Sequence, residues 1–190
     1  SLAVETFLQQ QKTHPSLKLI LVPRHVERTR EIATWLTCRL QQPDACHVPW
    51  YYRSKLTDQA SQLSGNSFIL LVDVTGELAA WWGLATMAFV GGSLDGVRGG
   101  QNMLEPAAYG VAVCFGPYTR NFRTEVSELL KAEAAIVVHD GTELTNFVTQ
   151  CLNDPAYSTK IGTRAQKLIE KNQGGTRLTA LRILDFLPVI

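Results

Sequence analysis

Five short apolar runs, each followed by a segment of helical length, constrain the fold of this chain more than any other feature of its sequence. The runs are largely continuous rather than alternating, and they occupy residues 17–22, 68–72, 86–90, 111–115 and 135–138. Strands that are apolar at nearly every position are buried on both faces, as in parallel sheets covered by helices. The pattern therefore predicts an α/β fold built on a parallel sheet.

Amphipathic segments between these runs predict the helices of a doubly wound domain, with helices on both faces of the sheet. The predicted helices cover residues 2–12, 24–40, 76–84, 102–109 and 121–132, and the chain beyond residue 138 is mostly helical. The polar segment 41–65 holds one possible strand, at 47–51. Ligands of such folds bind beyond the carboxyl ends of the strands, where the following helices begin.

The composition is that of one compact globular domain spanning residues 1–190, with 45% hydrophobic and 18% charged residues. A formal net charge of +1 indicates no global attraction to nucleic acid or to a membrane surface. Cys38, Cys46, Cys114 and Cys151 form no CxxC motif, which favours reduced intracellular thiols over a metal site.

Neither a signal peptide nor a run of about 18 apolar residues, as needed to span a bilayer, is present in the sequence. The chain begins inside the predicted helix 2–12. We therefore expect a fragment of a longer protein, with any membrane anchor outside it.

Pro23 and Arg24 open the first of three strand-to-helix junctions that carry unusual polar residues. Proline is tolerated at a helix start, but an arginine there is unfavourable because the dipole is already positive. An anionic ligand that contacts both the Arg24 guanidinium and the positive end of the helix dipole would account for an arginine at this position. The alternative is a solvated turn in which Glu27 and Arg28 form ordinary surface ion pairs.

Asp73, Thr75, Gly76 and Glu77 form the second junction, after the run 68–72. Glycine at this point permits a ligand to approach the backbone N–H groups of the helix start. In the alternative interpretation, Asp73 or Thr75 caps the helix and Glu77 is an ordinary partner of the helix dipole.

The third junction is the strongest candidate, because the pairs Gly91-Gly92 and Gly99-Gly100, together with Ser93, separate the run 86–90 from the next helix. Such a loop can surround a phosphate with backbone donors, and it fits neither the Walker nor the GxGxxG pattern. The candidate phosphate loop comprises Gly91, Gly92, Ser93, Gly99, Gly100 and Gln101. Asn102 and Glu105 can face the same pocket, where Glu105 would accept from a ribose hydroxyl. Alternatively, Asn102 caps the helix and Glu105 is its capping-box partner.

The loop 116–122, after the fourth run, has two interpretations as well. It forms one wall of the predicted cleft, or Asn121 merely caps the helix that follows.

Five motifs, taken together and in order, resemble those of 3-deoxy-D-manno-octulosonic acid (Kdo) transferases of lipopolysaccharide synthesis. They are P-R-H-x-E-R from residue 23, D-x-x-G-E-L from 73, A-F-V-G-G-S-L from 88, G-G-x-N-x-L-E-P-A-A from 99 and G-P-x-x-x-N-F from 116. Each piece alone is unspecific, but the combination is specific. The family carries a further domain of comparable size on the N-terminal side of these motifs, which is absent from this chain.

The resemblance implies the C-terminal half of a GT-B glycosyltransferase, in which two Rossmann-like domains enclose the active site. Such enzymes transfer Kdo from CMP-Kdo to a lipid A precursor, with inversion and without a metal or other cofactor, at the cytoplasmic face of the bacterial inner membrane. The resemblance assigns the catalytic carboxylate and the membrane association to the missing part, and no catalytic residue to this chain. It implies CMP contacts at Pro23, Arg24, Thr75, Gly76, Glu77, Asn102, Met103, Leu104 and Glu105.

Three departures from the family pattern bear on donor specificity. Gln101 and Tyr118 stand where the family commonly has histidine, and the glycine-rich loop is one residue longer, through 95–97. A histidine can carry a charge toward phosphate, whereas glutamine and tyrosine donate only neutral hydrogen bonds. Two other functions also fit the residues: a GT-B transferase or epimerase acting on a UDP-sugar, and a noncatalytic interaction module without nucleotide affinity.

Overall fold

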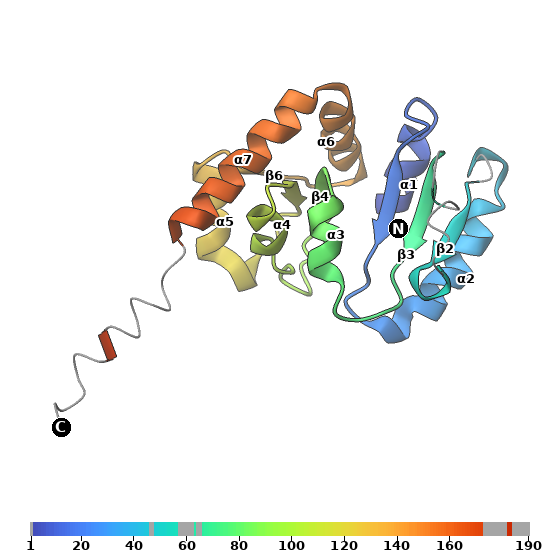
Figure 1. The fold of residues 1–190 in the computed structure, drawn as a ribbon, viewed down its shortest axis with the longest axis horizontal. Helices are drawn as coiled ribbons and strands as arrows, with labels where there is room; N and C mark the ends of the chain where they lie inside the picture. The colour runs from blue at the N-terminus through green and yellow to red at the C-terminus, as the bar shows by residue number, and fades with distance from the viewer. Residues whose placement is uncertain (1, 46–47, 57–62, 64–65, 173–181, 184–190) are drawn as a thin grey trace.

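The strands of the protein form two parallel sheets in a computed structural model that describes residues 2–45, 48–56, 63, 66–172 and 182–183. Within this part of the chain, each sheet has three strands, in the orders β1-β3-β2 and β4-β5-β6 (Figure 1). Their bounds are β1 Lys18–Leu21, β2 Trp50–Tyr52, β3 Phe68–Leu71, β4 Met87–Val90, β5 Ala112–Phe115 and β6 Ala135–Val137. The predicted parallel α/β architecture is confirmed.

Helices connect the strands and cover them. They are α1 Leu2–Gln10, α2 Thr29–Leu40, α3 Leu78–Leu84, α4 Leu104–Ala108, α5 Arg123–Lys131, α6 Gly141–Asn153 and α7 Pro155–Asn172. Short 3-10 turns η1 Val26–Arg28, η2 Pro43–Ala45, η3 Arg53–Lys55 and η5 Arg120–Phe122 follow or precede them. The five predicted runs are all strands, and the possible strand at 47–51 is β2, although residue 47 lies outside the described part.

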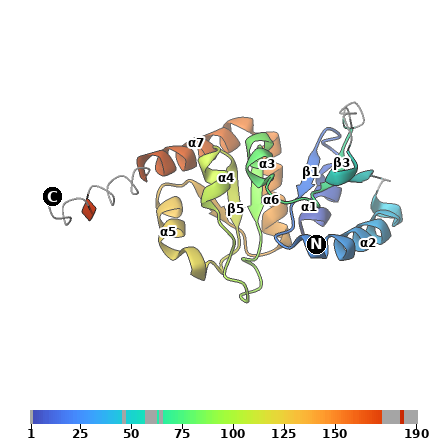
Figure 2. The same cartoon turned by 60° about the horizontal axis from the view of Figure 1, so that its bottom comes forward.

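β5 is the centre of the second sheet and is buried on both faces, as its sequence predicts. Val113 and Phe115 pack with apolar residues of α4, α5 and α7. Ala112 and Cys114 face the other way, into a cluster formed mainly with α6. Figure 2 shows α7 running alongside α4, so this sheet is enclosed by helices.

β3 has the same central place in the first sheet, and all four of its residues are buried. Ile69 and Leu71 pack with the apolar faces of α1 and α2. Phe68 and Leu70 point to the opposite face and are also removed from solvent. A strand between two parallel neighbours can bury every side chain only if it carries no polar residue, which the sequence FILL satisfies.

The two sheets lie next to each other, and α1 packs against α6 across their boundary (Figure 1). The hydroxyls of Thr6 and Thr145 lie 3.0 Å apart, and the Gln10 amide donates to Thr149 Oγ1 at 2.8 Å. No strand pairing joins β1 to β4 in the described part of the chain. Helix-to-helix contacts, rather than a continuous ladder, therefore link the two halves.

The described cysteines differ in their exposure: Cys38 is exposed, whereas Cys114 and Cys151 are buried. Cys38, Cys114 and Cys151 are free, whereas Cys46 lies outside the described residues. Burial raises the pKa of the Cys151 thiol to about 12, so that this side chain is protonated and unreactive at neutral pH. Among the helices described, none has the length and apolar character needed to cross a bilayer.

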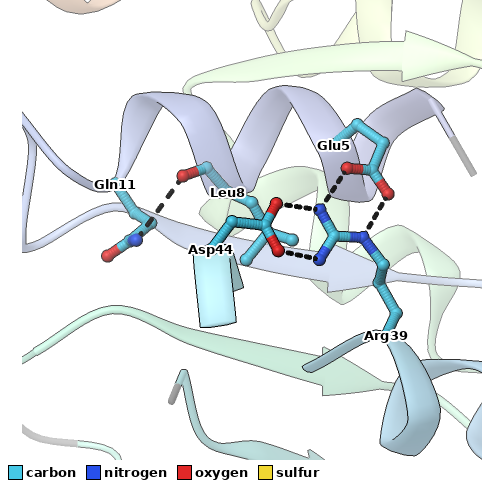
Figure 3. A network of polar contacts seen from close by, with 5 residues as sticks. All are labelled: Glu5, Leu8, Gln11, Arg39 and Asp44. Carbon is cyan, nitrogen blue, oxygen red and sulfur yellow. Dashed lines mark hydrogen bonds and ion pairs between the residues drawn. The ribbon is translucent and has the colours of Figure 1, made fainter. Parts of the chain in front are cut away.

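Arg39 fastens α2 to α1 and to the turn η2 through two carboxylates (Figure 3). Its guanidinium donates to Glu5 at 2.8 and 2.7 Å and to Asp44 at 3.0 and 2.8 Å. Hydrogen bonds from Arg39 hold the pKa of both carboxyl groups below their usual values. The Arg39 side chain is only 18% exposed, so this network is better ordered than a typical surface pair.

Replacing Arg39 by methionine is expected to lower Tm at pH 7 by roughly 2–4 °C. Because both carboxyl groups have a lowered pKa in the folded state, their stabilising effect is present above the unfolded pKa of about 4 and is lost as pH falls through the folded pKa. The Tm difference between wild type and Arg39→Met should therefore narrow below about pH 4 in calorimetry. A difference that is constant from pH 7 to pH 3 contradicts this account.

Gly162 lets α7 approach the connection between α4 and β5. A Cβ atom at this position would lie 1.8 Å from the backbone oxygen of Gly110, which cannot swing away. Gly162→Ala is expected to reduce the free energy of unfolding by roughly 3 kcal/mol, the upper end of overpacking costs. Denaturant titration measures this loss.

The matched control for that substitution is Gly83→Ala, which is also within a helix. Its Cβ would meet only the Tyr109 ring, at an ordinary 3.7 Å. We expect no loss, or a gain of up to about 1 kcal/mol, because alanine favours helix over glycine. Equal losses in the two variants would show that backbone contact at Gly162 is unimportant.

Candidate functional site

The carboxyl ends of the strands bring the sequence-predicted junctions to one edge of each sheet. In the first sheet, Leu21, Tyr52 and Leu71 are aligned neighbours at the ends of their strands. In the second sheet, Val90, Phe115 and Val137 are aligned in the same way. The loops that follow these residues hold the candidate site residues, except for Leu104 and Glu105, which lie in the first turn of α4.

Arg24 reaches from the loop after β1 to the glycine-rich loop after β4. Its Nη1 donates to the side-chain oxygen of Gln101, a residue 77 positions further along the chain. Pro23, beside it, is half-buried, whereas Arg24 is exposed. Two of the three predicted junctions therefore meet through a direct side-chain contact.

The predicted position of Arg24 at a helix start is wrong. Residue His25 is extended, the turn η1 begins at Val26, and α2 begins only at Thr29. The helix dipole acts only over the first turn, so it does not disfavour an arginine that lies five residues before α2. What positions Arg24 is its contact with Gln101, which sequence spacing could not reveal.

The loop between β3 and α3 contains Thr75 and Gly76, both exposed, and the half-buried Glu77. Gly76 has a φ of 86°, a conformation that favours glycine. Glu77 is the residue that precedes α3, and its side chain makes no capping bond. The alternative in which Asp73 or Thr75 caps this helix is therefore wrong.

Both carboxylates of this loop are held by the turn η3, which lies within the polar segment 41–65. Arg53 donates to Glu77 through Nε at 2.9 Å and Nη2 at 3.0 Å. Ser54 donates to Asp73 through its N–H at 2.8 Å and its hydroxyl at 2.5 Å. Burial raises the pKa of Asp73, but the bonds from Ser54 outweigh it, and the pKa lies below its usual value.

The glycine-rich loop closes on itself at its base. Gly100 N–H donates to the oxygen of Gly92 at 2.8 Å, and Gln101 N–H donates to that of Gly91 at 3.3 Å. Gly92, Gly99 and Gly100 have φ values of 72°, 75° and 84°. The glycines thus permit a tight loop, and two of the backbone donors expected to face a phosphate are used within the loop.

Ser93 is fully buried and joins the ends of β4 and β5. Its hydroxyl donates to Val90 O at 2.8 Å and accepts from Gly116 N–H, also at 2.8 Å. Its carbonyl accepts from Tyr118 N–H at 2.9 Å. In this arrangement, the predicted phosphate-loop serine supports the loop rather than facing solvent.

The start of α4 combines a capping contact with an exposed carboxylate. Asn102 Oδ1 accepts from Leu104 N–H at 3.0 Å, and Asn102 Nδ2 donates to Glu105 Oε1 at 3.0 Å. The capping alternative is thus partly realised, although Glu105 contacts the Asn102 side chain and not a backbone N–H. Met103 is fully buried in the core, whereas Glu105 is exposed.

The loop after β5 braces the glycine-rich loop. Asn121 donates from its side chain to Arg98 O at 3.0 Å and from its backbone to Gly99 O at 3.2 Å. Arg120 Nη2 donates to Val97 O at 2.7 Å. Asn121 caps neither η5 nor α5, so the interpretation as a wall of the site is favoured.

Positive charge accumulates at this edge without compensating contacts. Arg24 and Arg120 donate to neutral oxygens, and neither lies within ion-pair distance of a carboxylate among the described residues. Arg98 is 3.7 Å from Asp95, a loose pair. Arginines without a carboxylate partner favour an anionic ligand.

Two surface hollows lie elsewhere. One, of about 360 Å³, is lined by α5 and α7, and the other, of about 410 Å³, by α1 and α6. None of the predicted site residues lines either hollow.

Parallel strands with covering helices, and a glycine-rich loop beyond their carboxyl ends, define a Rossmann-like α/β domain of the class that forms half of a GT-B glycosyltransferase. In particular, the chain matches the crystal structure of the C-terminal CMP-Kdo binding domain of WaaA from Acinetobacter baumannii. The TM-score is 0.71 and the sequence identity 27%, over 88% of this chain and 81% of that one.

Curated relatives confirm the resemblance inferred from the motifs. The chain is 30% identical to 3-deoxy-D-manno-octulosonic acid transferase of Haemophilus influenzae over 92% of its length, and 30% identical to that of Bordetella pertussis over 91%. It is 32% identical to that of Rickettsia prowazekii over 90%. It spans 37%, 38% and 35% of these relatives' lengths, respectively. No family model matches the chain.

Ser93→Ala tests the supporting role assigned to this hydroxyl. The change leaves the buried Gly116 N–H without an acceptor, and we expect a loss of about 1–3 kcal/mol in the free energy of unfolding, measured by denaturant titration. Ser127→Ala is the matched control, because Ser127 is an exposed residue of α5, and it should be near neutral. A neutral Ser93→Ala would argue that the hydroxyl is free to contact a ligand.

Proposed function

We propose that this chain is the donor-binding domain of an inverting glycosyltransferase, which transfers Kdo from CMP-Kdo to a lipid A precursor. The contact between Arg24 and Gln101 carries the proposal, because it joins two of the predicted junctions into one cationic site. Relatives named as Kdo transferases, and a solved relative named for CMP-Kdo binding, support this donor.

Arg24 acts on the leaving group in the proposed mechanism. An acceptor hydroxyl attacks the anomeric carbon of the sugar, the bond from that carbon to the phosphate oxygen breaks, and CMP departs with growing negative charge. A fixed guanidinium stabilises that charge as it develops. The N–H group of Asn102, which no hydrogen bond within the described residues uses, adds a donor nearby.

The remaining candidate residues position the nucleotide. Glu105 is exposed and Glu77 is half-buried, so both can accept from ligand hydroxyls. Thr75 and Gly76 offer an exposed stretch of backbone close to Glu77. Pro23, Leu104 and the buried Met103 shape the site through backbone position.

Gln101, which stands where the family commonly has histidine, has a defined task in this proposal. Its amide oxygen accepts from Arg24, which a protonated imidazole could not do. The glutamine therefore orients the guanidinium instead of adding a second charge.

The proposed domain organisation assigns residues 1–190 to donor binding alone. The chain spans about a third of the length of its curated relatives, and the catalytic carboxylate, acceptor binding and membrane association are assigned to a preceding domain. Together the two domains would work at the cytoplasmic face of the inner membrane. The chain by itself should bind CMP without turnover.

A nitrogen-15 NMR titration of the 190-residue chain with CMP, UDP and GDP tests the proposed donor. We expect CMP to bind best and to shift amide signals near residues 24, 76 and 102–105. Tighter binding of UDP would instead favour a UDP-sugar enzyme. No shifts with any nucleotide would favour a noncatalytic interaction module.

Arg24→Ala should weaken CMP binding by about 2 kcal/mol, roughly thirtyfold, because one charge-assisted hydrogen bond is lost. Isothermal titration calorimetry measures the change. Arg28→Ala is the control, since Arg28 lies four residues away, is exposed and is paired with Glu31. Unchanged affinity in Arg24→Ala would remove Arg24 from the site.

A further inference from the structure

The turn η3 lies against the loop between β3 and α3 and forms hydrogen bonds with a residue near each end of that loop, Asp73 and Glu77. Arg53 holds the Glu77 carboxylate by two parallel hydrogen bonds of 2.9 and 3.0 Å. Ser54 holds the Asp73 carboxylate by its N–H and its hydroxyl. Two neighbouring residues of η3, Arg53 and Ser54, therefore fix two carboxylates that lie four positions apart in the loop between β3 and α3.

The middle of this loop, between Asp73 and Glu77, is exposed to solvent. Thr75 and Gly76 are exposed, and their N–H groups take part in no hydrogen bond within the described part of the chain. Loops fastened at both ends keep their backbone direction while the centre stays accessible. The arrangement suits a segment that must meet a ligand in one fixed conformation.

Arg53 leaves room on the Glu77 carboxylate for a second partner. Each oxygen accepts one hydrogen bond from Arg53, and a carboxylate offers about four acceptor positions in total. The side chains of Arg53 and Glu77 are 34% and 32% exposed, so the pair is accessible from one side. Glu77 can therefore bind Arg53 and a ligand hydroxyl together.

We propose that Arg53 and Ser54 are positioning residues of the donor site, which hold Glu77 and Asp73 so that Glu77 meets a hydroxyl of the bound nucleotide in a preset orientation. The inference rests on the proposed nucleotide-binding function. Without Arg53, the Glu77 side chain would have to lose its rotamer freedom when the nucleotide binds, which weakens binding. The expected loss in CMP affinity is roughly tenfold.

A charge-swap series with the 190-residue chain separates positioning from simple support of the fold. Arg53→Glu, Glu77→Arg and the double variant are compared for Tm and for CMP affinity by calorimetric titration. Each single variant should lose Tm and bind CMP at least tenfold more weakly. The double variant restores an ion pair, so Tm should recover, but CMP affinity should not, because the carboxylate is no longer at position 77.

Recovery of both Tm and CMP affinity in the double variant would overturn the proposal and leave the pair a structural one. Arg53→Lys provides a milder change for the case in which the swapped chains do not fold. Lysine keeps the charge but cannot donate two parallel bonds, so CMP binding should fall several-fold with little change in Tm. Wild-type affinity in Arg53→Lys would also overturn the proposal.

Arg164→Ala is the control for loss of an arginine pair away from this edge. Arg164, in α7, donates to the carboxylate of Glu133 at 2.6 Å. CMP affinity should be unchanged in this variant. If the wild-type chain does not bind CMP at all, the proposed function itself fails, and the inference fails with it. If the wild-type chain binds CMP and the Arg53 variants bind it with the same affinity, the proposed function stands and only this inference is lost.

Discussion

Burial of β3 and β5 on both faces is the constraint on which the rest of the structure depends. Each strand is central in its sheet, and neither carries a polar side chain, so both faces need a cover. Helices supply most of that cover, and parallel pairing then directs every strand end to the same edge. The site loops gather at the carboxyl edge of each sheet because they directly follow the ends of its parallel strands.

Electrostatic pairing at the edge divides the charged residues into two groups. The Glu77 carboxylate is paired with Arg53, and the Asp73 carboxylate accepts two hydrogen bonds from Ser54. Arg24 and Arg120, in contrast, contact only neutral oxygens among the described residues. A positive surface beside fixed acceptors is suited to a phosphate linked to a sugar with hydroxyl groups.

Local signals predicted some site residues and not others. The glycines of the loop after β4 were found because an apolar run ending in glycines marks a tight turn whatever its surroundings. Arg53 and Ser54 were missed, because they lie in a polar segment and act only through contacts with residues 19 and 24 positions away. Ser93, in the predicted phosphate loop, and Met103, among the CMP contacts that the resemblance implies, have fully buried side chains, which local spacing could not indicate.

The sequence by itself determined the class of fold and where along the chain the candidate site is expected. Continuous apolar runs allow no surface strand, and turn residues act over a few positions, so both can be read locally. Only the tertiary structure decided that the strands divide between two sheets, that Arg24 meets Gln101, and that Glu77 is held by Arg53. These contacts depend on how separate elements pack in space, and residues far apart in the sequence carry no mark of their eventual neighbours.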